Sequence, residues 1–173
     1  MPDRELAGRL ADGDPHAPRE LVERHYSELY RYARLMLRNS TEAEDAVQEA
    51  FVQALSALGK YPAERVRAMR LRAWLYRITL NIVRNRARKR GRAEEVEFSE
   101  ESVPDTGGAD REAVMDTLAA LSRLPEKQRA AVTLRYGQDL TFAEISTATG
   151  WPESTAKTNV RRGIERLRKE LTP

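Results

Sequence analysis

Five polar residues at helical spacing in the middle of the chain have the chemistry of polyanion recognition. They are Arg77, Asn81, Arg84, Asn85 and Arg88, on one stripe of a predicted helix. Guanidinium groups bind phosphate oxygens, and carboxamides can hydrogen-bond to base edges. Asparagine is a poor helix former, so two asparagines within a basic stripe favour a base-reading or phosphate-binding role. A helix face that is merely solvated is the alternative that the pattern leaves open.

A second group of candidate DNA-binding residues lies near the C-terminal end of the sequence. Thr141 and Glu144 have the spacing of a capping box, which opens a short helix that ends at Gly150, and Pro152 opens a longer one. One side of the longer helix is apolar, with Ala156, Val160, Ile164, Leu167 and Leu171. Its open faces carry Thr155, Lys157, Thr158, Arg161 and Arg162. This is the helix-turn-helix pattern, whose second helix enters a major groove; an ordinary helical hairpin is the alternative.

The composition argues against most catalytic and metal-binding chemistry. The 173 residues include no cysteine, which removes thiolate chemistry and Cys-ligated metals, and only two histidines, His16 and His25. Charged residues make up 33% and hydrophobic residues 40%, a balance that suits helices with a large solvated surface. The sequence has neither the apolar run of roughly 18–20 residues that a bilayer span needs nor a signal-peptide core. We therefore expect a cytoplasmic protein that makes no membrane contact of its own.

The charge is distributed in blocks, although the whole chain carries only +3. Residues 65–93 have a net charge of +11 without one acidic side chain, and residues 94–116 have a net charge of −8. The flanking segments 1–64 and 117–173 carry −4 and +4. A solvated helix face usually mixes both signs, so two basic blocks around an acidic one indicate two surfaces for a polyanion.

Apolar periodicity predicts an all-α protein with two small helical domains. Helices are expected at about 18–37, 41–58 and 71–90 in the first domain, with Thr41 and Glu44 as a capping box for the second of them. The stretch after Gly91 is rich in Glu and lacks this periodicity, which predicts a flexible acidic linker. The expected boundaries are 1–91 for the first domain, 92–112 for the linker and 113–173 for the helix-turn-helix domain.

The order of these elements resembles the extracytoplasmic-function (ECF) group of bacterial sigma factors, which have only the conserved regions 2 and 4. The resemblance spans nearly the whole chain, and its separate motifs are short. The matching segments are Asp12-Gly13-Asp14 with Tyr26 and Tyr30, Glu44 to Phe51, Trp74 to Ile78 with Asn81, Leu124-Pro125 with Arg129 and Leu134 to Tyr136, and Leu140 to Ile145 leading into Thr155 to Arg162.

The resemblance implies a role for each group of residues. Region 2 would bind and open the −10 promoter element through Arg77, Asn81, Arg84, Asn85 and Arg88, with the loop 64–70 and Asn81 receiving a flipped base. This loop departs from the family pattern because it is rich in Arg. Region 4 would read the −35 element as duplex through Thr155, Lys157, Thr158, Arg161 and Arg162. The residues implied to dock on core RNA polymerase are Asp45, Gln48, Glu49 and Phe51.

The sequence thus predicts a promoter-specificity subunit without catalytic activity, metal or cofactor. Its expected partners are core RNA polymerase, promoter DNA (duplex at −35, single-stranded at −10) and an anti-sigma factor. A stand-alone helix-turn-helix regulator is one alternative, although no sensory domain precedes the helix-turn-helix. A nucleic-acid enzyme is another, and it would need clustered carboxylates for Mg²⁺. The acidic residues of this chain gather instead in the predicted linker.

Overall fold

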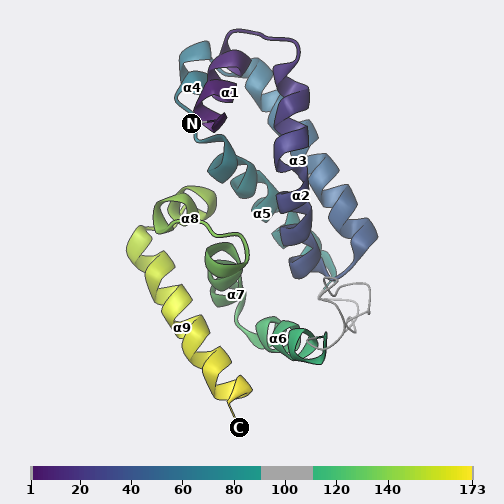
Figure 1. Cartoon of the computed structure of the whole chain (residues 1–173), viewed down its shortest axis with the longest axis vertical. Helices are drawn as coiled ribbons and strands as arrows, with labels where there is room; N and C mark the ends of the chain where they lie inside the picture. Colours follow the sequence, from purple (N-terminus) through teal and green to yellow (C-terminus); the bar gives the residue numbers. More distant parts are fainter. Residues whose placement is uncertain (1, 91–110, 173) are drawn as a thin grey trace.

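The computed structural model describes residues 2–90 and 111–172, and every regular element in these two ranges is a helix (Figure 1). The N-terminal unit consists of α1 (Pro2–Ala11), α2 (Ala17–Leu37), α3 (Ser40–Lys60), α4 (Ala63–Arg67) and α5 (Leu71–Arg90). The C-terminal unit consists of α6 (Arg111–Arg123), α7 (Glu126–Val132), η2 (Thr133–Gly137), α8 (Phe142–Thr149) and α9 (Glu153–Leu171). The predicted all-α fold with two helical units is confirmed. Most of the predicted linker lies outside the described residues, and its last two positions begin α6.

The N-terminal unit is a bundle in which α2, α3 and α5 pack against one another, with α1 and α4 at one end (Figure 1). The sequence did not predict α1, which buries Leu6 and Ala7. It also placed the cap of α3 two residues too late. The side chain of Asn39, not of Thr41, accepts the hydrogen bond from the backbone N–H of Glu42, and Thr41 lies exposed in the first turn. Asparagine is as good an N-cap as threonine, so α3 begins at the first suitable side chain after α2.

The C-terminal unit contains the predicted helix-turn-helix, formed by α8 and α9. The capping box at the start of α8 is present in both directions between Thr141 and Glu144, and Gly150 ends that helix at a φ of +78°. Helix α9 then packs closely on α7 at Gly163. A Cβ atom added there would lie 2.5 Å from Val132 Cγ2, so the helices approach at a distance that only glycine permits.

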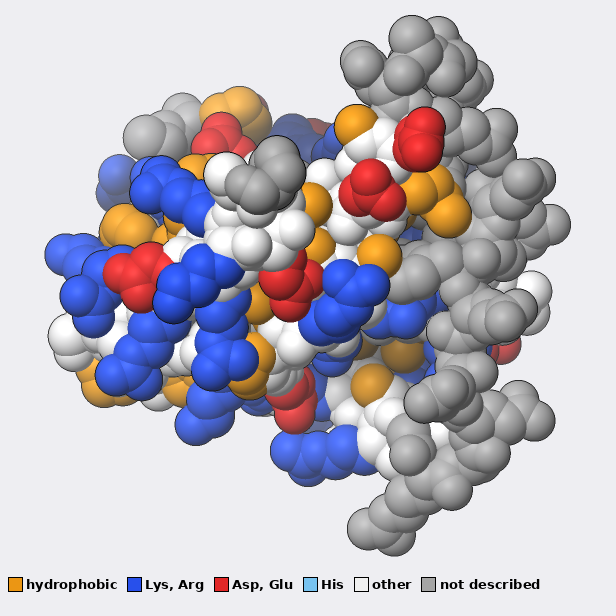
Figure 2. Space-filling model, turned by 90° about the horizontal axis from the view of Figure 1, so that it is seen from below, with side chains coloured by type: hydrophobic (Ala, Val, Ile, Leu, Met, Phe, Trp, Pro, Cys, Tyr) orange, Lys and Arg blue, Asp and Glu red, His pale blue; other side chains and the backbone are white. Residues whose placement is uncertain are grey.

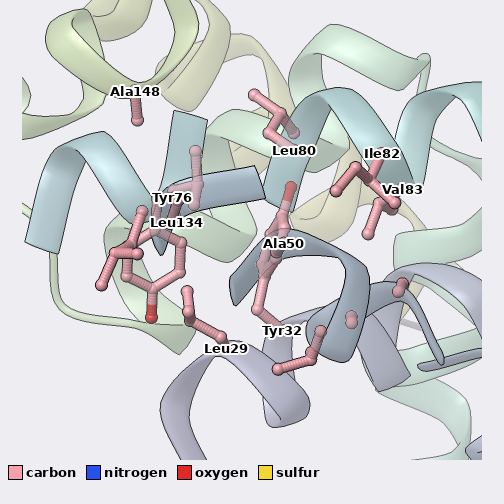
Figure 3. Packing of buried hydrophobic residues seen from close by; sticks show 14 of the residues in the cluster. Leu29, Tyr32, Ala50, Tyr76, Leu80, Ile82, Val83, Leu134 and Ala148 are labelled. Atoms are coloured by element: carbon pink, nitrogen blue, oxygen red, sulfur yellow. The ribbon is translucent and has the colours of Figure 1, made fainter. Parts of the chain in front are cut away.

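The two units share one hydrophobic core. Leu134, Leu140, Ile145 and Ala148 of the C-terminal unit belong to the same buried cluster as the interior of the N-terminal bundle. Figure 3 shows Leu134 beside Tyr76 of α5, with Leu29 and Tyr32 of α2 below them. Helix α5 is therefore covered by α2 and α3 on one side and by α8 on another.

Candidate nucleic-acid and polymerase surfaces

The basic stripe of α5 lies mostly in solvent. Arg77, Asn81, Asn85 and Arg88 are exposed, at spacings that place them along one face of the helix. Asn81 and Asn85 line a groove of about 630 Å³ between α5 and α3, together with Arg86, Lys89 and Arg90 from the same helix. Glu42 and Glu49 of α3 line the same groove, and they lie 3.0 Å from Arg90 and Arg86 respectively. The groove thus combines carboxamides, which suit base edges, with cations of which two are paired to carboxylates.

Arg84, the fifth residue of this stripe, is held by the C-terminal unit. Its Nε lies 2.9 Å from Glu126 Oε1, and its guanidinium carbon lies 5.8 Å from the centre of the Trp151 ring. Only 19% of its side chain is exposed. Arg84 therefore stands at the edge where the stripe meets α7 and the turn of the helix-turn-helix, and it is not free for DNA in this arrangement.

The structure separates the 64–70 loop from Asn81. Part of this loop forms the short helix α4, and its end lines an open pocket of about 1040 Å³ bounded by α1, α2 and α8. Asn81 instead lines the groove on the α3 side. Tyr61 and Trp74 are aromatic side chains of the kind on which a base can stack. Their ring centres are 6.3 Å apart, and the ring planes are inclined at 60°. Arg65 lies over the Tyr61 ring at 3.7 Å, and Trp74 is half-buried rather than wholly in the core.

The second candidate DNA surface is the outer side of α9. Its buried stripe consists of Ala156, Val160, Gly163 and Leu167, which pack toward α7 and α8. The predicted reading residues lie away from this stripe. Lys157, Arg161 and Arg162 are exposed, and Thr155 and Thr158 are half-buried. In Figure 2, which looks along the molecule from the lower end of α9, Lys and Arg side chains crowd the side on which α9 lies, with few acidic ones among them.

Helix α3 presents a polar face of a different character. Asp45, Gln48 and Glu49 are exposed at spacings of three and one, and Val52 continues the same face with 69% of its surface in solvent. Phe51, which the sequence grouped with them, is only 5% exposed and stacks on Tyr26 at 6.3 Å. Phe51 therefore lies beneath this face rather than on it, because burying an aromatic ring in the core is more favourable than exposing it to water.

Arg86 joins the α3 face to the α5 stripe. Its Nη2 lies 3.0 Å from Glu49 Oε2, so the acidic face and the basic helix meet in an ion pair at the edge of the α3–α5 groove. Sequence reasoning missed Arg86 and Val52. The signal for Val52 was available as an apolar residue seven positions after Asp45 on a polar face, whereas the Arg86 pairing depends on how two helices pack.

A buried polar contact joins the two units beneath these surfaces. The Tyr76 hydroxyl lies 3.1 Å from Glu28 Oε2 of α2 and 3.0 Å from Gln138 Oε1 of the C-terminal unit. Arg72 donates from Nε to Glu28 Oε2 at 2.9 Å and from Nη2 to the Gln138 carbonyl oxygen at 2.6 Å. Tyr76 is wholly buried and Gln138 is 5% exposed, so neither side chain can turn to water instead.

Burial and charge both act on the ionisable groups of this contact. Burial, reinforced by the neighbouring Glu28 carboxylate, raises the pKa of the Tyr76 hydroxyl far above its ordinary value and keeps it a neutral donor. Burial alone would raise the pKa of Glu28, but hydrogen bonds from His25 and Arg72 outweigh it and hold that pKa below its ordinary value. Glu28 is therefore an anion that accepts from three side chains.

The described residues hold neither a metal cluster nor a membrane span. Within 2–90 and 111–172, no group of three or more His, Asp or Glu side chains could bind a metal ion. None of the helices described is long and apolar enough to cross a bilayer. What these residues do present is one acidic face and two basic surfaces on separate helical units, which defines the class as a two-unit helical DNA-binding protein.

Comparison with known proteins identifies the family. The family models for Sigma-70 region 2 and Sigma-70 region 4 match residues 21–93 and 115–167. The chain is 30% identical to the RNA polymerase sigma-H factor of Pseudomonas aeruginosa, with 99% of this chain and 94% of that protein covered. It is 34% identical to the ECF sigma factor SigM of Mycobacterium tuberculosis, with 98% and 84% covered. The chain belongs to the ECF group of RNA polymerase sigma factors, which direct core polymerase to promoters.

Solved structures agree with this assignment. CnrH in complex with the cytosolic domain of CnrY matches with a TM-score of 0.76 at 26% identity, over 99% of this chain and 97% of CnrH. The fold also matches that of the sigma factor RpoE of Bartonella quintana, in complex with the anti-sigma factor NepR, with a TM-score of 0.71 at 24% identity, over 88% and 95% of the two chains. The resemblance to sigma factors predicted from the sequence is thus confirmed, and a stand-alone helix-turn-helix regulator is not favoured.

Proposed function

We propose that the three surfaces divide the work of a sigma factor among them. The outer side of α9 reads a duplex −35 element, the stripe of α5 binds and helps to melt a −10 element, and the polar face of α3 docks on core polymerase. The observation that carries this proposal is that basic and acidic side chains lie on different exposed faces of separate helices. These helices belong to the segments that match Sigma-70 regions 2 and 4.

The −35 surface consists of Thr155, Lys157, Thr158, Arg161 and Arg162. These side chains stand on a helix that is braced from behind by α7 and α8, the arrangement by which a helix-turn-helix places side chains in a major groove. The hydroxyls and cations can contact phosphates and base edges there.

The −10 surface consists of Arg77, Asn81, Arg84, Asn85 and Arg88. Melting requires a protein group to replace the stacking and pairing that a base loses. Asn81 supplies hydrogen bonds, and we add an aromatic surface formed by Trp74, two turns before Asn81 on α5, and Tyr61, the C-cap residue of α3. A face of stacking rings beside cations is suited to single strands.

The docking surface consists of Asp45, Gln48 and Glu49, with Phe51 holding it from beneath and Val52 in contact with the partner. Carboxylates and a carboxamide complement a basic protein surface and fix its register. An apolar side chain at the centre of such a patch supplies contact area that a polar rim does not. Glu42 and Glu44 stabilise the start of α3 through the helix dipole, so their presence does not require a contact with polymerase.

The partners follow from these surfaces. We expect core RNA polymerase and promoter DNA, and a protein inhibitor of the anti-sigma kind, since CnrH was solved with a second protein bound. The chain would act in the cytoplasm, where polymerase and chromosome are, and would contribute binding rather than a catalytic step of its own. It requires neither metal nor cofactor for this work.

Transcription in vitro with purified core polymerase and a library of promoter DNA tests the proposal. The wild-type chain should select a subset of promoters, whereas Gln48→Ala with Glu49→Lys should weaken association with core at least tenfold, because a cation replaces an anion at a charged contact. Asp116→Lys, a charge reversal outside the three surfaces, is the control. Normal core binding by the double variant would show that α3 is not the docking helix.

A further inference from the structure

The Asp12-Gly13-Asp14 turn is the part of the resemblance to sigma factors that none of the three proposed surfaces uses. Gly13 reverses the chain between α1 and α2 at a φ of +76°, a value that favours glycine. The Asp14 carboxylate accepts hydrogen bonds from Arg9 Nε at 2.8 Å and from the backbone N–H of His16 at 2.9 Å. The turn therefore fixes the end of α1 at the start of α2.

Asp12 extends from this turn to Arg67 of α4, which is 55 positions away in the sequence. Arg67 Nη2 donates to Asp12 Oδ1 at 2.6 Å. The same guanidinium lies over Gly8 of α1, where an added Cβ atom would be 3.8 Å from Nη1. In Figure 1, α1 and α4 lie side by side at one end of the bundle, and α4 packs mainly on α1. Helix α1 is thus the main support of α4.

Helix α4 depends on this support because it is only five residues long. So short a helix is not stable by itself in water. Its N-cap residue, Pro62, makes no side-chain capping hydrogen bond, and of the five residues of α4 only Val66 is buried. The position of α4 is therefore set by the helix that packs on it.

Helix α4 also places an arginine on the proposed base-stacking surface. Arg65 and Arg67 are two positions apart, so at about 100° per residue they point to nearly opposite sides of α4. Arg67 meets Asp12, whereas the guanidinium carbon of Arg65 lies 3.7 Å from the centre of the Tyr61 ring. Tyr61 in turn lies against Trp74. Aromatic rings beside a cation suit a single strand, since the rings can stack on a base while the guanidinium contacts the backbone.

We propose that Asp12 is a positioning residue for binding of the single-stranded −10 element. Through Arg67 it holds α4 where Arg65 covers Tyr61, and Arg65 thereby becomes a further DNA-binding residue of the −10 surface. Neither Asp12 nor α1 touches DNA in this role. The inference rests on the proposed function of the −10 surface, whereas the contact between α1 and α4 is a property of the free chain.

Amide hydrogen exchange of the free chain measures how firmly α4 is held. The backbone N–H groups of Val66 and Ala68 close the turns of α4 and exchange when it opens. Asp12→Arg sets a second cation against Arg67 and should speed this exchange severalfold. Glu5→Arg makes the same change of charge at an exposed position of α1, and it should leave the exchange unchanged.

Binding of a single-stranded oligonucleotide by the holoenzyme measures the consequence. The probe is the −10 strand of a promoter that the wild-type chain selects from the library, and a scrambled strand of the same composition is the comparison. The side chains of Asp12 and Arg67 are 64% and 54% exposed, and exposed ion pairs are weak. Asp12→Arg should therefore lower the ratio of the two affinities by about threefold to fivefold. Core binding and −35 duplex binding should stay normal.

Two further variants test whether Asp12 acts through the proposed contacts. Adding Arg67→Asp to Asp12→Arg restores an ion pair with its charges exchanged, and it should recover most of the affinity ratio. Arg65→Ala should cause a loss of similar size, to which Asp12→Arg adds little, because both changes act on one contact. Asp12→Asn removes only the charge and should give a smaller loss, which keeps the test available if Asp12→Arg does not fold.

The outcomes separate the positioning role from the proposed function. Unchanged exchange of α4 in folded Asp12→Arg, or equal acceleration by Glu5→Arg, overturns the support of α4 by Asp12. Faster exchange with an unchanged affinity ratio, or no recovery on adding Arg67→Asp, overturns the positioning role. Wild-type holoenzyme that does not distinguish the two strands contradicts the proposed function of the −10 surface, whereas the exchange experiment still decides whether Asp12 supports α4.

Discussion

The two proposed DNA surfaces of this sigma factor differ in how much of each is exposed and free of contacts with the other unit. Helix α9 buries one stripe within its own unit, and its five predicted reading residues point away from that stripe. Helix α5 is packed on two sides, and Arg84, one of its five predicted residues, is bound by the other unit. A helix in a hairpin keeps its outer side open, whereas a helix at the junction of two units offers only the strip that neither unit covers.

Replacing Gly163 should have the largest effect, and it should impair the α9 surface while leaving the α5 surface intact. Gly163→Ala pushes a Cβ atom against Val132, and overpacking of this kind costs about 1–3 kcal/mol of unfolding free energy. Duplex −35 binding should fall together with stability. Chemical denaturation measures the stability, and fluorescence anisotropy measures the DNA binding. Gly59→Ala in α3 meets open space and should be neutral or stabilising. Equal stability of the two variants would mean that α7 and α9 do not approach as closely as the structure has them.

Asn81→Ala tests the free strip of α5. It should reduce open-complex formation by about tenfold, within the range of one lost base contact, while −35 duplex binding by the whole chain stays normal. The defect should be smaller on a premelted template, because base capture is then no longer needed to open the duplex. Permanganate footprinting on paired and premelted promoters measures both. Equal defects on the two templates would indicate a folding effect in the N-terminal unit.

Arg162→Ala on α9 should have a smaller effect. If the guanidinium contacts only phosphate, binding falls by a similar factor on every sequence and the salt slope decreases by about 1. Arg166→Ala, another exposed arginine four residues along α9, is the matched control. A loss confined to particular −35 sequences would instead make Arg162 a base-reading residue.

Lowering the pH should weaken the Glu28 contacts with α5, and this is the smallest of the expected effects. The pKa of Glu28 is held below its ordinary value of 4.5 by His25 and Arg72, and the Tyr76 hydroxyl also faces it. Its contribution is therefore fully present above about pH 4.5 and is lost as the pH falls through the lowered value. Thermal unfolding between pH 7 and pH 3 should show this loss, and Glu28→Gln should flatten the profile. A profile unchanged by that substitution would assign the acid sensitivity to other carboxylates.

Apolar spacing was enough to predict most helices and the helix-turn-helix, because burial dictates which positions are apolar. It failed where two local signals compete. Asn39 and Thr41 are both acceptable caps, and the earlier one is used. Helix α1 is short, and most of its burial comes from two residues, Leu6 and Ala7, which is too little for a periodic pattern.

The contacts that the candidate site residues make were less predictable than the residues themselves. The stripe on α5 could be found from spacing, whereas the face on α3 came from the resemblance to sigma factors. That Arg84 would meet Glu126, or Arg86 meet Glu49, depends on packing between segments that have no shared pattern. The same holds for Tyr76 and Gln138, which are 62 positions apart and ordinary at their own places in the sequence.

The long separation of Tyr76 and Gln138 has a consequence for how the chain is made. Helices α1 to α5 are complete at Arg90, but the partner that covers α5 is complete only after Ala148. At the usual 5–20 residues per second, the ribosome needs roughly 3–12 s to add the 58 residues between these points. For that interval the apolar side of α5 beneath Tyr76 is uncovered on a nascent chain, and it is then open to chaperones and to polymerase.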